Sequence, residues 1–327
     1  MAEVRILSTE EIRELVPMSV AVGLMREAFA WISSGESVVP QRLSMEMERD
    51  KSRSLMMPAY SAVLQRYAAK VVTLSDDNPK RNLPFIHGLL LLFDSATGVP
   101  LALMNAEYIT VLRTGAASGV ATDLLARADA GVAMIFGAGA QARSQLAGIA
   151  SVRRLDRVLV YSPLTAQTER FCNEMQSKYT FDILAAESPH KVSDADIVCA
   201  ATTAEQPVFE DADLKSGVHI NGIGSYKPST REIPSETIKR SKIVVDSRSA
   251  ALAEAGDLVI PMKDGLINNS HIYAELGEIL LGQKPPRMDS TEITVFKSVG
   301  NAVQDLAVAA YAARIADHDG VGKIVDI

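Results

Sequence analysis

One stretch of the sequence has residue types and spacing suited to binding a phosphate-containing ligand. Five apolar residues, Val132 to Phe136, run directly into the pattern Gly137-x-Gly139-x-x-Ala142. The first glycine permits a tight turn, the second lets a pyrophosphate approach the backbone, and the alanine lets the next helix pack closely on the strand. The N-terminus of that helix would present free N–H groups to the anion.

The residues around this pattern favour a dinucleotide site over an ordinary strand–helix turn made of small residues. We expect a helix from Gln141 to Ala150 and a second strand from Arg157 to Ser162, so the glycines lie in a strand–turn–helix–strand unit. The residues expected to contact the dinucleotide here are Gly137, Gly139, Ala140 and Gln141.

The end of the second predicted strand bears on the choice of nicotinamide cofactor. An NAD site usually has an acid there, which binds the ribose hydroxyls. Here the chain has no acid to repel a 2′-phosphate, and Ser162 and Thr165 could donate to one. No arginine is adjacent, so the pattern favours NADPH while leaving NADH open. Thr202 and Thr203 follow the fourth strand and are predicted to line the cofactor groove.

Two cations occupy unusual settings. Lys70 lies among apolar residues of a predicted strand, Tyr67 to Leu74, and either faces solvent in the alternation or points into a site. Arg113 lies in a predicted helix, Ala106 to Ala126, that is crowded with small residues. A glycine inside a helix costs about 1 kcal/mol relative to alanine. We therefore expect another backbone or a cofactor ring to pack tightly on this helix.

The elements that position these residues form two groups. The first 35 residues are predicted to be helical, and a largely antiparallel sheet follows, with strands at 42–47, 54–57, 67–74, 89–93 and 99–104. Pro58 is expected to end the strand at 54–57. From 131 to 246 strands alternate with helices, which indicates a parallel, doubly wound sheet. Its predicted strands are 132–136, 157–162, 181–184, 196–200, 218–223 and 243–246.

Three more elements are predicted after residue 250. They are a helix near 273–281, a strand at 292–297 and a closing helix at 302–316. The closing helix is too long and amphipathic to be a tail. We expect it to return to the first domain, which makes that domain discontinuous.

Composition excludes several classes of protein. The 327 residues are 47% apolar and 22% charged, which is ordinary for a globular protein. The formal charge of −7 argues against a nucleic-acid surface, and no segment approaches the ~20 apolar residues of a membrane span. The N-terminus lacks the features of a signal peptide, and Cys172 and Cys199 are expected to be plain thiols, which together predict a cytoplasmic protein. The histidines are scattered, so no metal site is predicted.

The chain resembles the ornithine cyclodeaminase/mu-crystallin family over nearly its whole length. The strings that carry the resemblance, in the family's order, are Ala68-Ala-Lys-Val71, Leu112-Arg-Thr-Gly-Ala-Ala-Ser118, Gly137-Ala-Gly-Ala-Gln-Ala142, Asn221-Gly-Ile-Gly224, Val295-Phe-Lys-Ser-Val-Gly300 and Gln304-Asp305. The resemblance implies an α/β protein in which a Rossmann-type doubly wound parallel sheet is inserted in an α+β domain with a mainly antiparallel sheet, through which homodimers form. The implied domains are 1–118 with 302–327, for substrate binding and dimerisation, and 119–301, for the dinucleotide.

The resemblance also implies roles for particular residues. Family substrates carry an α-carboxylate beside an amino, imino or keto carbon that exchanges a hydride with the nicotinamide. Arg42, Lys70 and Arg113 match the positions that bind this carboxylate, and Lys70 also lies where it could donate a proton to the imine nitrogen. Taken alone, Arg42 could be a surface residue of an edge strand.

Three further positions have two interpretations each. Thr114 and Val299 match family positions near the nicotinamide, although Val299 could be plain core. Asp305 could orient Lys70 or a water molecule, or could simply complement the dipole of the closing helix.

Two departures from the cyclodeaminase pattern point to the reductase branch. That pattern has a glutamate where this chain has Leu55 and an aspartate where it has Tyr226. Ring closure of a diamine needs a carboxylate to bind and deprotonate the distal amine, so cyclodeamination is disfavoured. An apolar pocket with Leu55 and Tyr226 would suit a ring without a distal charge, although Tyr226 could instead be a surface turn residue.

We therefore expect NAD(P)H-dependent reduction of a cyclic α-imino acid, Δ1-pyrroline-2-carboxylate to proline or the six-membered homologue to pipecolate. Three alternatives stay open: ornithine cyclodeaminase, alanine dehydrogenase, and a non-catalytic ligand carrier like the hormone-binding mu-crystallins.

Overall fold

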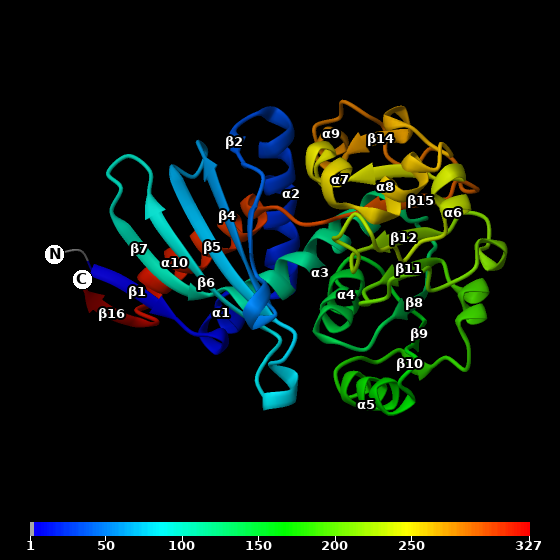
Figure 1. The fold of residues 1–327 in the computed structure, drawn as a ribbon, viewed down its shortest axis with the longest axis horizontal. Coiled ribbons are helices and arrows are strands. Elements are labelled where there is room, and N and C mark those ends of the chain that lie inside the picture. The colour runs from blue at the N-terminus through cyan, green and yellow to red at the C-terminus, as the bar shows by residue number, and fades with distance from the viewer. Residues whose placement is uncertain (1–2) are drawn as a thin grey trace. The chain divides into compact units, whose positions relative to one another are not determined.

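The computed structural model describes residues 3–327, which form two compact units (Figure 1). Unit 1 contains the chain up to Arg113 and the segment Asn301–Ile327, and unit 2 is Thr114–Gly300. The domain boundaries predicted from the sequence, after 118 and after 301, stay predictions. The first predicted domain begins at residue 1, and residues 1–2 lie outside the described part.

Unit 1 is built on an eight-stranded, mainly antiparallel sheet, sheet A. Its order is β16-β1-β7-β6-β5-β4-β2, with β3 also paired to β4, and only β1 and β7 run parallel among the described pairs. The strands are β1 (Glu3–Leu7), β2 (Ser37–Val38), β3 (Leu43–Met47), β4 (Ser52–Ser61), β5 (Arg66–Ser75), β6 (Ile86–Asp94), β7 (Pro100–Asn105) and β16 (Lys323–Asp326). The helices of this unit are α1 (Thr9–Leu15), α2 (Met18–Ser34), α10 (Ala302–Asp319) and the start of α3 (Ala106–Leu125).

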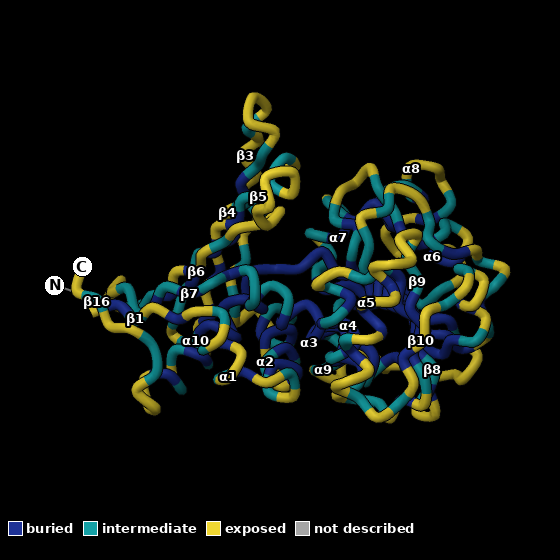
Figure 2. Tube along the Cα trace, turned by 90° about the horizontal axis from the view of Figure 1, so that it is seen from below, coloured by how far each residue is buried: buried dark blue, intermediate teal, exposed yellow. Residues whose placement is uncertain are grey.

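Sheet A has one covered face and one open face. Helix α10 packs on β4 to β7, and α2 packs on α10. Residues that alternate along β5 and β6, such as Lys70 and Leu90, are buried on the covered face, whereas Val71 and Leu89 point to the other side and are exposed. Figure 2 shows exposed residues along β3 and the adjoining ends of β4 and β5. β3 has the period-two sequence pattern of a strand, but neither of its faces is buried.

The structure corrects several predicted elements. The first 35 residues are not all helical, because β1 pairs with β7 and with β16. β4 does not end at Pro58 but continues to Ser61. Pro58 is tolerated because the edge of β4 away from β5 is unpaired at this point: β3 pairs with β4 only up to Met56, and β2 pairs only with Tyr60 and Ser61. The helix expected near 273–281 is a strand, β14, followed by the short helix α9.

Unit 2 is the predicted doubly wound unit. Its eight-stranded sheet B has the order β10-β9-β8-β11-β12-β15-β13-β14, and every described pair is parallel. The strands are β8 (Val132–Phe136), β9 (Arg157–Tyr161), β10 (Asp182–Ala185), β11 (Ile197–Ala200), β12 (His219–Gly222), β13 (Lys242–Val245), β14 (Ile272–Glu275) and β15 (Thr294–Lys297). The helices are α4 (Ala140–Ala150), α5 (Thr165–Gln176), α6 (Ser235–Arg240), α7 (Arg248–Glu254), α8 (Gly256–Lys263), α9 (Leu276–Leu280) and most of α3. These two sheets confirm the predicted fold class.

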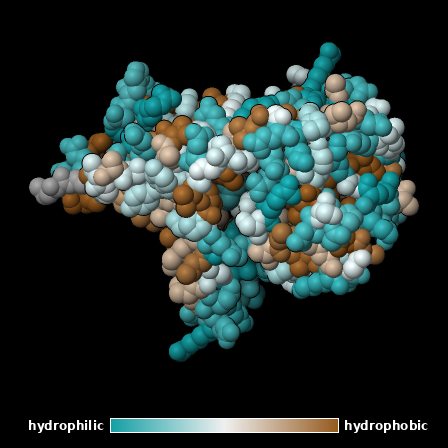
Figure 3. All heavy atoms as spheres, turned by 90° about the horizontal axis from the view of Figure 1, so that it is seen from above, coloured by the Kyte–Doolittle hydropathy of each residue, from teal (hydrophilic) through white to brown (hydrophobic). Residues whose placement is uncertain are grey.

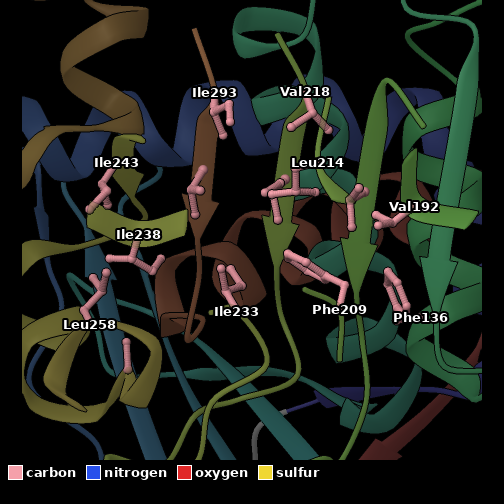
Figure 4. Packing of buried hydrophobic residues seen from close by; sticks show 14 of the residues in the cluster. Phe136, Val192, Phe209, Leu214, Val218, Ile233, Ile238, Ile243, Leu258 and Ile293 are labelled. Atoms are coloured by element: carbon pink, nitrogen blue, oxygen red, sulfur yellow. The ribbon is translucent and has the colours of Figure 1, made fainter. Parts of the chain in front are cut away.

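Buried aliphatic and aromatic side chains fill the space beside sheet B. Figure 4 shows part of one such cluster, in which Phe136, Phe209 and Ile233 lie beside the strands of sheet B. Apolar burial on both faces explains why these strands are nearly continuous apolar runs in the sequence. Both cysteines are buried free thiols, as expected.

Gly115 of α3 and Gly148 of α4 allow these two helices to cross closely. A Cβ on Gly115 would overlap the backbone of Ser144 in α4, and a Cβ on Gly148 of α4 would overlap the carbonyl of Gly115. Of the two possibilities predicted for this helix, a neighbouring backbone fills the space at Gly115. Among the described residues no single helix is long and apolar enough to cross a membrane; α1 and α2 pass that test only together, as a pair bent by 82°.

Candidate active site

In unit 1, three of the predicted site residues form one buried ionic cluster. Lys70 Nζ lies 2.7 Å from Asp305 Oδ2, and Arg113 Nε donates to Asp305 Oδ1 at 3.2 Å. The side chains of Lys70 and Asp305 are only 2% and 1% exposed. Lys70 reaches this position from the covered face of β5, Asp305 from the first turn of α10, and Arg113 from α3. Of the two orientations considered for Lys70, it adopts the inward one.

The surroundings of Lys70 change its acidity. The pKa of Lys70 is lowered to about 8, and burial of the ammonium is the largest cause. The positive charges of Arg113 and Arg42 contribute to this lowering, while the charge and hydrogen bond of Asp305 oppose it. Lys70 Nζ also donates to Thr110 Oγ1 at 3.1 Å. A lysine tuned in this way can release a proton near neutral pH.

Arg42 and Leu55 come near this cluster through strand register. Leu43 is opposite Met56, Met57 is opposite Lys70, and Leu55 is opposite Val72. Leu55 therefore lies on the same sheet face as Lys70, two residues away along the ladder. Arg42 directly precedes β3, is half-buried, and is close enough to act on the pKa of Lys70.

The structure adds Gln304, to which the sequence assigned no role. Its Oε1 accepts from Arg113 Nη1 at 2.8 Å and from the backbone N–H of Asn301 at 3.2 Å. Its Nε2 is buried and has no hydrogen-bond partner among residues 3–327. A buried, unpaired donor beside cations fits a carboxylate oxygen. In the sequence, Gln304 appeared only as part of the family string Gln304-Asp305.

In unit 2, the glycine pattern forms the turn that it predicts. Gly137 directly follows β8 and has a φ of 101°, a conformation that favours glycine. Gly139 is the N-cap of α4, has no side-chain cap, and has open space where a Cβ would stand. Ala140 is exposed and begins α4, and Oε1 of Gln141 is buried without a partner in the described part of the chain. An uncapped helix N-terminus beside open space fits a pyrophosphate.

The other predicted cofactor residues lie at several strand ends. Ser162 and Thr165 follow β9, where Ser162 Oγ accepts from the N–H of Leu164 and Thr165 is exposed at the start of α5. Thr202 and Thr203 follow β11; a Cβ on Gly137 would lie 3.4 Å from Thr202 Cγ2, and Thr203 is exposed.

Three predicted residues of unit 2 are partly or wholly buried. Val299 belongs to the buried cluster beside sheet B, so it is a core residue whatever else it contacts. Thr114 is buried in α3, and its carbonyl accepts from Gln145 Nε2. Tyr226 is half-buried and packs against the same cluster as Val299, so its ring is not simply a surface group.

Comparison with known proteins agrees with the motifs and the geometry. The model of the ornithine cyclodeaminase/mu-crystallin family matches residues 2–317. The chain belongs to that family. It is 38% identical to a Delta(1)-pyrroline-2-carboxylate reductase of Bacillus cereus, over 98% of this chain and 99% of that protein. The predicted family membership is thereby confirmed.

Two solved structures of family members are similar to this one. The Thermococcus litoralis Delta(1)-pyrroline-2-carboxylate reductase in complex with NADH and L-proline has a TM-score of 0.95 and 41% identity, covering 98% of this chain and 100% of that one. An archaeal alanine dehydrogenase dimer with bound NAD has a TM-score of 0.94 and 31% identity, covering 99% of each chain. Both bind a nicotinamide dinucleotide, as was predicted for this chain from its glycine turn.

Proposed function

We propose that this protein reduces cyclic α-imino acids with NADH or NADPH, converting Δ1-pyrroline-2-carboxylate to L-proline, the six-membered homologue to L-pipecolate, or both. The observation that carries the proposal is the buried cluster of Lys70, Asp305 and Arg113, which combines a proton donor with cations. The glycine turn of unit 2 and the similarity to reductases of this substrate support it.

The residues in and near the cluster have three tasks in this proposal: carboxylate binding, proton delivery and orientation of the proton donor. Arg113 and Arg42 hold the substrate carboxylate, since a guanidinium fixes a carboxylate in one orientation. Gln304 Nε2 donates to the same carboxylate. Lys70 delivers the proton that the imine nitrogen gains, and Asp305 keeps Lys70 oriented.

Bound NADH or NADPH supplies the hydride that the imine carbon gains. In unit 2 the dinucleotide would be held by the turn of Gly137 and Gly139, the N-terminus of α4 and the segments that contain Ser162, Thr165, Thr202, Thr203 and Val299, with Thr114 near the nicotinamide. β9 ends without an acid, which permits a 2′-phosphate, whereas the similar structures contain NADH or NAD. The proposal therefore includes both cofactors.

Leu55 and Tyr226 favour a ring without a distal charge. Neither side chain can bind and deprotonate the second amine of ornithine, so this chain is proposed to be a reductase and not a cyclodeaminase. The 31% identity to an alanine dehydrogenase keeps pyruvate with ammonia as the second candidate substrate.

The proposal includes a homodimer that forms through the open face of sheet A. Its apolar residues are 37–57% exposed and form a continuous strip across four strands: Leu43, Met45, Met56, Val71, Leu89 and Leu91. Figure 3 shows brown, apolar side chains along the downward-projecting arm, which Figure 2 identifies with β3, β4 and β5. An apolar strip of this kind marks a protein interface. The free thiols are compatible with the reducing cytoplasm that the proposal assigns.

A substrate panel tests the function. Cyclic and linear imino acids, and pyruvate with ammonia, are each incubated with NADH and with NADPH. Ornithine is incubated with NAD⁺ and with NADP⁺, and nicotinamide absorbance and released ammonia are recorded in every case. We expect rapid oxidation of the reduced cofactor with the five- or six-membered cyclic imine. Ammonia and proline from ornithine without net cofactor use, or turnover confined to pyruvate, would overturn the proposal.

A further inference from the structure

Unit 2 contains a buried carboxylate, Glu232, whose hydrogen bonds join two loops at the same edge of sheet B. Glu232 lies after β12 and is fully buried. Its Oε1 accepts from the backbone N–H and the hydroxyl of Thr202, both at 2.7 Å. Its Oε2 accepts from the backbone N–H groups of Gly224, at 2.6 Å, and Ser225, at 2.9 Å. Four donors occupy both oxygens, which is the full capacity of an ionised carboxylate.

These contacts fix the spacing between the β11 and β12 loops. A Cβ on Gly224 would overlap the backbone of Thr202, so the two loops touch at main-chain distance. Thr202 in turn lies beside Gly137 of the phosphate-binding turn. The hydroxyl of Thr202 donates to Glu232 and accepts from the N–H of Ala204. This hydroxyl therefore links the loop after β11 to Glu232.

A second layer holds Glu232 itself. Asp257 of α8 accepts from the backbone N–H groups of Glu232, at 2.7 Å, and Ile233, at 2.9 Å. The other oxygen of Asp257 lies 2.8 Å from Nζ of Lys297, which donates to the carbonyl of Ser225 at 2.6 Å. Lys297 ends β15 and precedes Val299. The network thus connects the carboxyl ends of β11, β12 and β15, the edge at which parallel sheets bind ligands.

We propose that Glu232 is a positioning residue for dinucleotide binding, which holds the Thr202 and Gly224–Ser225 loops in their binding conformation before the cofactor arrives. This inference rests on the proposed dinucleotide site but not on the identity of the imino acid. Both oxygens of Glu232 are occupied by donors from the two loops, so its proposed role is to act through these loops and not on the cofactor directly. Removing its negative charge should weaken cofactor binding more than it weakens the fold.

The sequence offers a matched control at the opposite edge of the sheet. Asp196 precedes β11 and accepts from the backbone N–H groups of Gly131 and Val132, at 3.1 and 2.9 Å, while also pairing with Arg127 and Lys215. It is a buried, backbone-binding carboxylate like Glu232, but it lies at the amino ends of the strands. Asp196→Asn therefore makes the same chemical change away from the cofactor edge.

The experiment compares Glu232→Gln with Asp196→Asn in the full-length protein. NADH and NADPH affinities are measured by nicotinamide fluorescence without any imino acid, and melting temperatures are measured in parallel. We expect Glu232→Gln to raise the cofactor Kd at least about tenfold, because its amide N–H would face backbone donors. We expect Asp196→Asn to lower the melting temperature with a cofactor Kd unchanged within about twofold. In steady state, Glu232→Gln should raise KM for the cofactor more than it lowers kcat.

Equal changes of Kd in both variants, or an unchanged Kd in Glu232→Gln, would overturn the proposal. If Glu232→Gln does not fold, hydrogen exchange of the unchanged protein decides. The amides of Thr202, Gly224 and Ser225 should be protected before cofactor is added, and protection that arises only with cofactor would count against pre-formed loops. Wild-type protein that binds NADH but reduces no imino acid would refute the proposed function alone. Failure to bind either dinucleotide would refute both.

Discussion

Within residues 3–327, both units bury a lysine against an aspartate, and the partners of these two pairs differ in kind. Lys70 and Asp305 in unit 1 are 2.7 Å apart, and Lys297 and Asp257 in unit 2 are 2.8 Å apart. The first pair is bonded to other side chains: Lys70 donates to Thr110, and Asp305 accepts from Arg113. Arg113 in turn donates to Gln304. The second pair is bonded to the main chain, through the carbonyl of Ser225 and two backbone N–H groups.

This difference separates a reactive pair from a structural one. Side-chain partners can rotate when a ligand arrives, and the lowered pKa of Lys70, about 8, allows its proton to move. Backbone partners tie the pair to the loops, so any movement of Lys297 or Asp257 would move strand ends. The same two residue types thus serve chemistry in one unit and loop geometry in the other.

The largest expected effect is loss of the reactive pair. Lys70→Met should lower kcat/KM for imine reduction by about a thousandfold, because the proton donor is gone. Cofactor affinity, measured by fluorescence, should stay unchanged, since unit 2 is untouched. A Lys70→Met variant that retains the full rate on the best substrate would remove Lys70 from the mechanism.

The structural pair should show its effect in stability. Lys297→Met leaves Asp257 charged and buried without its cation, and should lower the free energy of unfolding by about 3–5 kcal/mol. Lys70→Met should cost less, because Arg113 still neutralises Asp305. Urea unfolding of both variants measures the difference. If Lys70→Met is the less stable of the two, the distinction between the pairs fails.

The sequence predicted the local parts of this architecture better than the distant ones. The alternation of strands and helices in unit 2 and the turn at Gly137 were predictable, because each depends on neighbouring residues. The sequence did not predict β1 and β16. These short strands are stabilised by pairing with each other, although they lie near opposite ends of the sequence. The strand predicted at 54–57 was shorter than β4, because the unpaired edge that tolerates Pro58 depends on the neighbouring strands and not on the sequence of β4.

The same reasoning applies to the site. Lys70, Arg113 and Asp305 were selected by family motifs, but only tertiary structure shows that they touch. Glu232 had no assigned role, because its donors come from two loops, at Thr202 and at Gly224–Ser225, which only the fold brings together around it. The lowered pKa of Lys70 likewise depends on its burial, and the alternation along the strand did not decide whether Lys70 is buried.

The pH dependence of the rate should report the reactive pair. Lys70 acts as an acid only while protonated, so kcat/KM for reduction should fall about tenfold per pH unit above pH about 8. Asp305 raises the pKa of Lys70, so Asp305→Asn should move this fall to lower pH. Rate profiles of both proteins with one cyclic imine measure the shift. A fall that moves to higher pH in the variant would show that another group controls the rate.

The smallest predicted effect concerns Gln304, the member of the reactive cluster with an unpaired donor. Gln304→Met keeps the length of the side chain but removes Nε2, together with Oε1, which accepts from Arg113 and Asn301. It should raise KM for the imino acid about fivefold with kcat nearly unchanged. Comparing Δ1-pyrroline-2-carboxylate with Δ1-pyrroline, which lacks the carboxylate, isolates the contact, because the variant should not differ from wild type on the second compound. In Glu232 of unit 2 every lone pair is already used, whereas Gln304 keeps a donor for a ligand. An equal loss on both compounds would make Gln304 a structural residue like Glu232, and the contrast between the two units would then rest on Lys70 alone.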